Sequence, residues 1–287
     1  MIEMIEMLAA AKLTLSLRVL GVRSDGYHEL EALVVNLNEP HDLLTARCGG
    51  SGVRLRVTGP AAGGIPDDET NLVARAVRAL AEVAPAAADV EITVKKSIPT
   101  GAGLGGGSAD AAAVLRTLAK LLHVPTDDVM RIAAGVGSDV PVCLRGGAAW
   151  MRGRGERVEL TTLPTLRVLV VVPPFSLTTA DVYRAYDDLG DRASARTVSP
   201  PRELASSLPL LVNDLEPAAE CVDGRLAAFR RELEAAAGLP PLLAGSGSAY
   251  ALLCGDESEW HARAERVERA LGVPVHSALS LQPYPPW

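Results

Sequence analysis

The chain has 287 residues, of which 48% are hydrophobic and 22% are charged, and its formal net charge is −7. This composition is typical of a soluble globular protein and excludes a disordered chain. The acidic balance argues against a general nucleic-acid-binding protein, but it allows a small anionic ligand. No apolar run reaches the roughly 18 residues of a membrane span, and the acidic residues 1–7 lack the basic flank of a secretory signal. We therefore expect no membrane partner.

The four cysteines are widely separated, at Cys48, Cys143, Cys221 and Cys254. Because the sequence contains no Cys-x-x-Cys pair and no Cys/His cluster, a structural zinc site is not expected. Reduced, scattered cysteines predict a cytoplasmic protein.

Hydrophobic periodicity predicts alternating strands and amphipathic helices along the chain. The expected strands are Lys12–Leu20, 27–36, Val53–Thr58, Val90–Lys96, Arg167–Val172, Ala249–Cys254 and Val273–Leu281. The expected helices are Thr70–Val83 with Thr70 as N-cap, Ala109–Leu122, Asp127–Ala134, Ala180–Leu189, Gly224–Gly238 and Asp256–Leu271. Residues 191–201 are polar and contain proline, which indicates a loop. The lack of strict βαβ alternation favours an α+β fold, and we expect two domains, residues 1–158 and 159–287.

Residues 99–110 are the most informative segment, because five of the seven residues from Gly101 to Gly107 are glycine. Glycine clusters usually mark flexible turns, and the spacing of Gly101, Gly103 and Gly106 also fits a dinucleotide-binding pattern. That pattern requires a βαβ unit with an acidic residue about 20 positions further on, whereas the aspartates at that distance follow a helix-to-helix turn. A Walker loop is excluded, since no lysine in the chain follows a glycine.

The interpretation that remains is a phosphate-binding loop between a strand and a helix. Glycines leave the backbone N–H groups uncovered, and the following helix directs the positive end of its dipole at the loop. Ser108 stands at or next to the expected helix N-cap, where its hydroxyl is available to a phosphate or a metal ion. The segment therefore predicts a polyphosphate site.

Two further turns contain candidate site residues. Asp139 is either a structural turn residue or a catalytic carboxylate that accepts the proton of a substrate hydroxyl. In the second interpretation Lys12 lies beside it, keeps it ionised and neutralises charge on the transferring phosphoryl group. The small residues from Gly245 to Ser248 form either a plain turn or a wall of the site where backbone amides approach a phosphate.

The glycine motif, the Asp139 turn and the Gly245 loop, in this order and spacing, resemble the GHMP kinase family. Ala11-Lys12-Leu13-Thr14-Leu15 and the segment Asp-Gly-Tyr-His-Glu-Leu at residues 25–30 resemble the branch that phosphorylates 4-diphosphocytidyl-2-C-methyl-D-erythritol. The resemblance runs over nearly the whole chain. It implies a two-domain GHMP kinase fold, with an N-terminal domain like ribosomal protein S5 domain 2, a ferredoxin-like C-terminal domain and a site between them.

The resemblance also implies a reaction: transfer of the ATP γ-phosphate to the 2-hydroxyl of that substrate, in the non-mevalonate route to isoprenoid precursors. Mg²⁺ is expected from phosphoryl-transfer chemistry, although the sequence contains no dedicated metal site. The implied catalytic residues are Asp139, as base, and Lys12. The implied ATP contacts are Pro99, Gly101, Gly103, Leu104, Gly105, Gly106, Gly107 and Ser108, with Asn71, Leu72 and Lys96 at the adenine. The implied substrate contacts are Tyr27 and Tyr183 stacked on the cytosine, with His28, Thr14, Thr179, Gly245, Ser246 and Gly247.

Thr14 departs from the resemblance, since the family usually has Asn there. Its shorter hydroxyl replaces an amide donor and acceptor, which predicts a weakened, shifted or water-mediated substrate contact. Two other functions stay open: a homoserine or mevalonate type of kinase, against which Tyr27 and His28 argue, and a non-catalytic nucleotide-binding paralogue, against which Lys12 and Asp139 argue. The expected state is a monomer or a weak homodimer.

Overall fold

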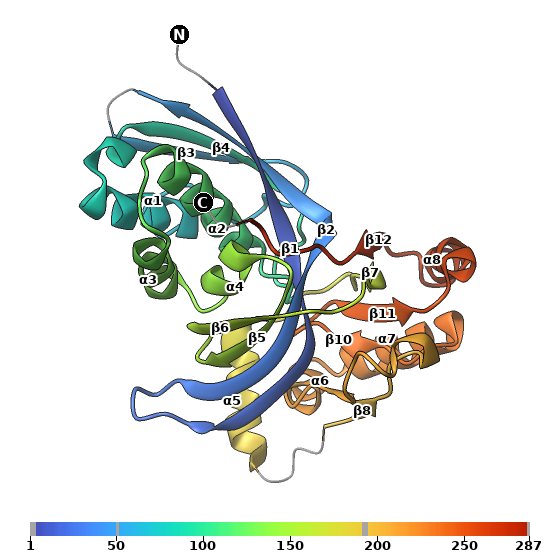
Figure 1. The fold of residues 1–287 in the computed structure, drawn as a ribbon. Coiled ribbons are helices and arrows are strands. Elements are labelled where there is room, and N and C mark those ends of the chain that lie inside the picture. The colour runs from blue at the N-terminus through green and yellow to red at the C-terminus, as the bar shows by residue number, and fades with distance from the viewer. Residues whose placement is uncertain (1–3, 50–51, 191–194, 286–287) are drawn as a thin grey trace.

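The computed structural model describes residues 4–49, 52–190 and 195–285, and its helices pack on two sheets (Figure 1). The strands are β1 (Met4–Val22), β2 (His28–Cys48), β3 (Val53–Thr58), β4 (Val90–Lys95), β5 (Ala148–Gly153), β6 (Arg157–Thr161), β7 (Arg167–Val171), β8 (Thr197–Val198), β9 (Leu211–Val212), β10 (Leu242–Leu243), β11 (Tyr250–Cys254) and β12 (Val275–Leu279). The helices are α1 (Leu72–Val83), α2 (Gly106–Leu121), α3 (Thr126–Val136), α4 (Val140–Arg145), α5 (Thr179–Leu189), α6 (Glu216–Val222), α7 (Arg225–Ala237) and α8 (Glu257–Leu271).

The first sheet is built around the long antiparallel pair β1 and β2. Its strand order is β3-β4-β2-β5-β6, with β1 paired to β2 outside this path. The register of β1 on β2 shifts between Ala10 and Lys12, and Lys12 then lies opposite Asn36. Because a β-bulge redirects the side chains that follow it, this irregularity helps to set the direction of Lys12.

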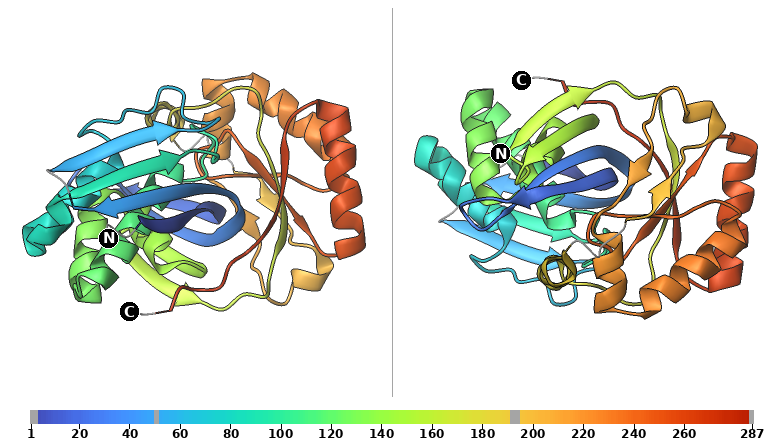
Figure 2. Two further views of the ribbon diagram at one scale, coloured as in Figure 1. Left: turned by 90° about the horizontal axis from the view of Figure 1, so that it is seen from above. Right: turned by 90° about the horizontal axis from the view of Figure 1, so that it is seen from below.

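Helices α1 to α4 form a layer that packs on this sheet through α2 (Figure 2). The inner face of α2 is rich in alanine, and Ala111, Ala112 and Ala113 are buried beside Leu115 and Leu118. Small side chains let the helix lie close to β1, and each fully buried leucine contributes roughly 1.5–3 kcal/mol. The packing therefore fixes α2, and with it the glycine loop at its N-terminus.

The second sheet has the strand order β10-β11-β7-β12, and all of its pairs are antiparallel. Helices α7 and α8 pack together beside this sheet (Figure 2), and the indole N–H of Trp260 on α8 donates to the carbonyl of Val168 on β7 at 3.2 Å. After β12 the chain returns to the first sheet, where Ser280 pairs with Leu37.

The α+β class is confirmed, because the only parallel pair among the described strands is β3 with β4. Two expected helix starts are wrong. The N-cap of α1 is Asn71, whose side chain accepts from Val73 N, and not Thr70. Helix α2 begins at Gly106 after a left-handed Gly105, so Ser108 lies inside the first turn and not at the cap. Glycine adopts the left-handed conformation at no steric cost, which allows the helix to start three residues early.

Other elements are longer than expected or were not expected. Strand β1 begins at Met4 rather than Lys12, β2 continues to Cys48, and β5, β6, α4 and α6 were not foreseen. In the expected loop 191–201, residues 191–194 lie outside the described residues, and β8 occupies two of the others. The boundary expected after residue 158 falls within β6, which pairs with β5 of the first sheet, and the division into two domains stays a proposal.

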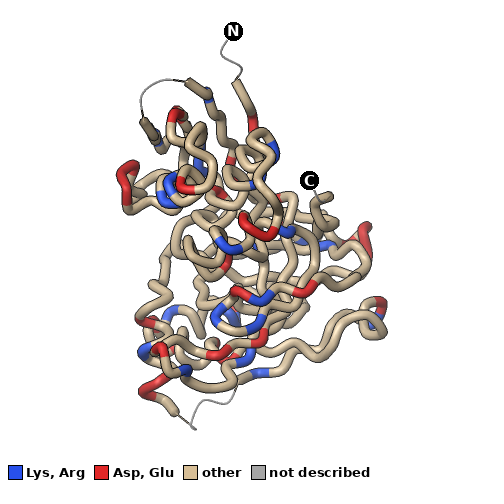
Figure 3. The backbone as a smooth tube through the Cα atoms, turned by 60° about the vertical axis from the view of Figure 1, so that its left-hand side comes forward, with Lys and Arg blue, Asp and Glu red and all other residues tan. Residues whose placement is uncertain are grey.

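The charged residues and the cysteines are spread over the described chain. Figure 3 shows basic and acidic residues interspersed along the backbone tube. All four cysteines are unpaired. Within the described ranges, none of the helices has the length and apolar character needed to cross a bilayer.

Candidate active site

One cavity of about 1020 Å³ contains almost all of the predicted site residues. Strand β1, the loop between β1 and β2, the glycine loop, the start of α4, helix α5 and the Gly245 loop all contribute to its walls. Gly247 does not line it: a Cβ there would meet the Leu243 and Leu177 side chains. The volume is at the upper end for a single small-molecule site, so it offers room for two ligands.

The glycine loop and the Gly245 loop are joined backbone to backbone. Ser248 N donates to Gly101 O at 3.3 Å, and Ala249 N donates to Ala102 O at 3.1 Å. Gly103 has a φ of +76°, and a Cβ on it would lie 1.8 Å from Ala244 O. Only glycine allows this close approach, so the two loops form one wall.

The first turn of α2 provides the expected anion site. Its backbone N–H groups have no acceptor within the helix, and the helix dipole is positive there. Leu72 lies beside it, with its side chain 3.5 Å from the position of a Cβ on Gly107. The amide of Asn71 is engaged locally, since Oδ1 accepts from Val73 N and Nδ2 donates to Pro66 O at 2.7 Å. Its contact with adenine stays a prediction.

Lys12 and Asp139 meet at the wall of the cavity. Lys12 Nζ lies 3.4 Å from Asp139 Oδ2, with the two side chains 8% and 28% exposed. Lys12 also donates to Thr14 Oγ1 at 3.2 Å, and its side chain runs beside Gly105, where a Cβ would be 2.7 Å from Lys12 Cγ. Asp139 is the residue before α4, and its carboxylate caps no backbone N–H of that helix. The carboxylate therefore makes no capping hydrogen bond to α4.

Lys96 lines the cavity, and its side chain is held in a buried cluster of charges. Its buried ammonium forms ion pairs with two carboxylates, those of Asp42 and of Asp110, and the Asp110 Oδ2 atom is 2.6 Å away. Asp42 is fully buried and also accepts from Ile98 N at 2.8 Å and from Ser97 N. The three residues thus fasten β4 and α2 beneath the glycine loop, and a role of Lys96 at adenine stays a prediction.

The charges of this buried cluster are unequal, with two carboxylates and one ammonium. Burial raises the pKa of Asp110 well above its ordinary value, against the opposing effect of Lys96, and the Asp42 carboxylate raises it further. The Oδ1 atom of Asp110 has no hydrogen-bond partner among the described residues. A proton on Asp110 would balance the cluster, because a buried unpaired charge is costly.

Aromatic and polar residues of β2 and α5 line another part of the cavity wall, near Asp139. His28 Nε2 is 2.7 Å from Asp187 Oδ1, and the His28 ring lies 4.8 Å from that of Tyr183. Burial raises the pKa of Tyr183, and the nearby Asp139 carboxylate raises it further. Thr179 Oγ1 lies 3.0 Å from Ser246 Oγ. This side therefore offers rings and hydrogen-bonding groups close to Asp139.

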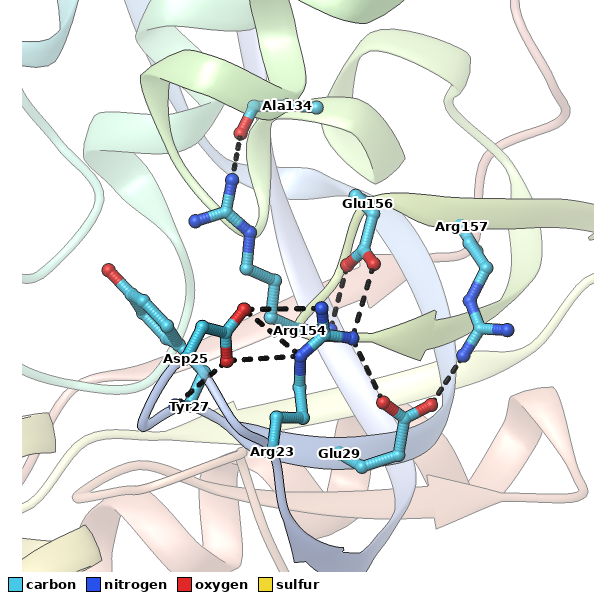
Figure 4. A network of polar contacts seen from close by, with 8 residues as sticks. All are labelled: Arg23, Asp25, Tyr27, Glu29, Ala134, Arg154, Glu156 and Arg157. Carbon is cyan, nitrogen blue, oxygen red and sulfur yellow. Dashed lines mark hydrogen bonds and ion pairs between the residues drawn. The ribbon is translucent and has the colours of Figure 1, made fainter.

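A network of charged residues supports Tyr27, which is 51% exposed at the cavity rim (Figure 4). Tyr27 N donates to Asp25 Oδ1 at 3.2 Å, and the Arg154 guanidinium lies 5.2 Å from the Tyr27 ring while it donates to Ala134 O at 3.1 Å. The other members of the network are Arg23, Glu29, Glu156 and Arg157. Single exposed ion pairs contribute little, but several that share partners restrict the turn that carries Tyr27.

Sequence reasoning missed four charged residues at or beneath this site: Asp42, Asp110, Arg154 and Asp187. Asp187 follows Tyr183 by one helical turn, so a search for neighbours on the same helix face would have found it. Arg154 is part of the Gly-Arg-Gly-Glu segment and Asp110 of the glycine motif, but their sequence positions alone do not reveal their partners. Asp42 has no local signal, since it lies in a strand far from Lys96 in sequence.

Comparison with known proteins finds a matching family, related sequences and related structures. Residues 71–147 match the GHMP kinases N terminal domain. The 4-diphosphocytidyl-2-C-methyl-D-erythritol kinase of Pelotomaculum thermopropionicum is 41% identical over 84% of this chain and 85% of its own length, and that of Bradyrhizobium diazoefficiens is 38% identical over 90% and 92%.

Among solved structures, a 4-(cytidine 5'-diphospho)-2C-methyl-D-erythritol kinase is 33% identical and superposes with a TM-score of 0.77, covering 96% of this chain and all of its own. A homoserine kinase from Cytophaga hutchinsonii, 19% identical with a TM-score of 0.70 over 99% of this chain and 96% of its own, shares the fold.

Proposed function

The chain belongs to the 4-diphosphocytidyl-2-C-methyl-D-erythritol kinase branch of the GHMP kinase family, and we propose that it transfers the γ-phosphate of ATP to the 2-hydroxyl of that compound. This reaction is a step in the synthesis of isoprenoid precursors. The observation that carries the proposal is the Lys12–Asp139 pair, which lies between a glycine loop suited to phosphates and an aromatic pocket suited to a base.

In the proposed mechanism, Asp139 accepts the proton of the 2-hydroxyl as the hydroxyl oxygen bonds to the γ-phosphorus. The bond between the γ-phosphorus and the bridging oxygen breaks, and its electron pair leaves with ADP. Lys12, 3.4 Å from the Asp139 carboxylate, stabilises the charge of the phosphoryl group in transfer. The first turn of α2 holds the remaining phosphates with its backbone N–H groups.

The donor set around the phosphate loop fits a Mg²⁺ ion that arrives with ATP. Within the described ranges, His, Cys, Asp and Glu nowhere form a group of three or more suited to a metal. Mg²⁺ needs only one or two protein ligands when substrate phosphates supply the others, and Ser108 and Asp139 both line the cavity. Ser108 would hold the ion, which neutralises phosphate charge when bound.

The acceptor pocket supports a cytidine-bearing substrate rather than a small alcohol. Tyr27 and Tyr183 line the same cavity, and two flat rings provide faces on which a base can stack. His28 lies between Tyr183 and Asp187, so its orientation is fixed for a hydrogen bond to the base edge. Thr14, 2% exposed and bonded to Lys12, is proposed to contact the substrate near the transferred phosphate.

A coupled ADP-release assay with Mg-ATP tests the proposal. The acceptors are 4-diphosphocytidyl-2-C-methyl-D-erythritol, homoserine and mevalonate, each with the same enzyme preparation. Turnover confined to the cytidyl compound supports the proposal. Turnover confined to another acceptor would contradict the assigned pocket, and ATP binding without turnover on any acceptor would favour the non-catalytic paralogue.

A further inference from the structure

The C-terminal segment after β12 leaves the second sheet and crosses to the helix layer of the first. Figure 1 shows this dark red segment running from β12 toward α2 and α4. Leu281 N donates to Asn36 O at 2.8 Å, and Asn36 is the residue opposite Lys12 in the β1–β2 pair. Tyr284 N donates to Arg145 O at 3.0 Å. The segment is therefore bonded to the strand beside Lys12 and to the end of α4.

The Tyr284 ring is held between the two helices that begin at the active site. The guanidinium of Arg116 on α2 lies 3.8 Å above the ring. On the α4 side, a Cβ on Gly146 would be 2.5 Å from a ring carbon of Tyr284, and a Cβ on Gly147 would be 2.5 Å from Pro283 N. Both glycines have positive φ values, +68° and +69°. The Gly146-Gly147 pair is thus shaped to receive the C-terminal segment.

We propose that Tyr284 is a positioning residue, which locks α2 and α4 together at the ends remote from the cavity and so fixes the glycine loop relative to Asp139. Helix α2 starts at the glycine loop and α4 starts directly after Asp139. Arg116 is ten residues from the start of α2, about 15 Å along the helix. A displacement of about 1 Å between reacting groups can cost 100-fold in rate, so loosening this clamp is expected to slow phosphoryl transfer without removing a binding group.

The chain contains a reporter for the clamp and two internal controls. Cys143 lies within α4 and is buried, Cys254 is buried in β11 of the second sheet, and Cys221 is exposed. Burial and the neighbouring Asp139 carboxylate raise the pKa of Cys143 to about 12, so its thiol reacts with an alkylating reagent only when α4 opens. Labelling of Cys254 reports opening of the second sheet, and labelling of the exposed Cys221 shows that the reagent is active in every sample.

The test compares Tyr284→Ala, Tyr284→Phe and Arg116→Met with the wild type, by steady-state kinetics and by N-ethylmaleimide labelling mapped by peptide mass. We expect Tyr284→Ala to lower kcat about tenfold, with KM for both substrates within about twofold, and to label Cys143 at least about tenfold faster with Cys254 unchanged. Tyr284→Phe keeps the ring and its contact with the Arg116 guanidinium but loses the hydroxyl that faces Arg116, so its kcat and Cys143 labelling should lie close to those of the wild type and far from those of Tyr284→Ala. Arg116→Met should also lower kcat and speed the labelling of Cys143, each by a smaller factor than Tyr284→Ala does.

Unchanged kcat and a protected Cys143 in Tyr284→Ala would overturn the proposal. So would equal acceleration at Cys143 and Cys254, which would mean a general loss of stability, and so would a Tyr284→Phe variant as impaired as Tyr284→Ala. The kinetic arm rests on the proposed function, whereas the labelling arm does not. If the wild type fails to turn over the cytidyl compound, the proposed function fails, and the Cys143 labelling still decides the role of Tyr284.

Discussion

Lys12 Nζ and Asp139 Oδ2 lie 3.4 Å apart, although Lys12 belongs to the first strand and Asp139 directly precedes a helix near the middle of the chain. The bulge in β1 and the packing of α2 against both elements bring them together. Replacing Asp139 by Asn keeps the shape of the side chain but removes the proton acceptor. We expect kcat to fall by roughly 10²–10⁴, with ATP affinity, measured by calorimetry, within about twofold.

The Asp139→Asn prediction has a control in the same pair. Lys12→Met should also lower kcat, and the double variant should lose less than the sum of the two single effects, because the residues act together. Strict additivity in the Lys12→Met/Asp139→Asn variant would argue against a functional pair. Near-normal turnover of Asp139→Asn would remove Asp139 from the mechanism.

The contact between the glycine loop and the Gly245 loop predicts that Gly103→Ala disables the phosphate site. The new methyl group would lie 1.8 Å from Ala244 O, and the left-handed backbone alone costs roughly 1–2 kcal/mol for a residue with a side chain. We expect a lower melting temperature and at least about a tenfold loss of kcat/KM for ATP, as for any displaced binding group.

Gly63→Ala is the matched control for Gly103→Ala. A Cβ on Gly63 meets no atom within 4 Å, and its φ lies outside the left-handed region. The melting temperature and kinetics of this control should match the wild type. If Gly103→Ala behaves in the same way, the glycine loop does not depend on its contact with Ala244.

Tyr27→Ala tests the proposed base pocket. Stacking of a base on an aromatic ring is worth about 1–3 kcal/mol, so KM for the cytidyl substrate should rise at least about fivefold, while KM for ATP stays unchanged. Val22→Ala, in the same hairpin and 68% exposed, serves as the control and should alter neither constant. An unchanged KM for the cytidyl substrate in Tyr27→Ala would disprove the stacking role.

The buried cluster of Asp42, Lys96 and Asp110 predicts a pH-dependent stability. The pKa of Asp110 is raised in the folded protein, so the folded state retains a proton that the unfolded chain releases above a pH of about 3.9. Relative to Asp110→Asn, the free energy of unfolding of the wild type should therefore fall as pH rises above this value, by up to about 1.4 kcal/mol per pH unit. It should level off above the raised pKa.

Urea unfolding of both proteins between about pH 4.5 and pH 8 measures this difference, with stabilities extrapolated to water. Since Asn cannot titrate, the subtraction removes the contribution of the shared groups outside the cluster and leaves the titration of the cluster itself. A difference that stays constant with pH, or that grows as pH rises, would show that Asp110 is ionised in the folded cluster.

The sequence identified residues that line one cavity better than it identified the limits of the elements. The glycine loop, Lys12 and Asp139 could be found because their chemistry depends on local motifs. The start of β1 at Met4 could not, since residues 4–11 show no alternation of polar and apolar residues and are ordered by pairing with β2. The Lys96 cluster was missed for a similar reason: Asp42 and Lys96 meet only because β2 pairs with β4. Long-range pairing of this kind leaves no mark in a local pattern.

The most direct test of the central claim is ³¹P NMR of the reaction of the wild-type protein with Mg-ATP and 4-diphosphocytidyl-2-C-methyl-D-erythritol. The proposed mechanism predicts that the ATP signals are replaced by those of ADP, and that one new phosphomonoester signal appears while the diphosphate of the substrate stays intact. Asp139→Asn should give this signal only at a greatly reduced rate. Loss of ATP without a new monoester, or release of inorganic phosphate in its place, would contradict transfer to the substrate hydroxyl.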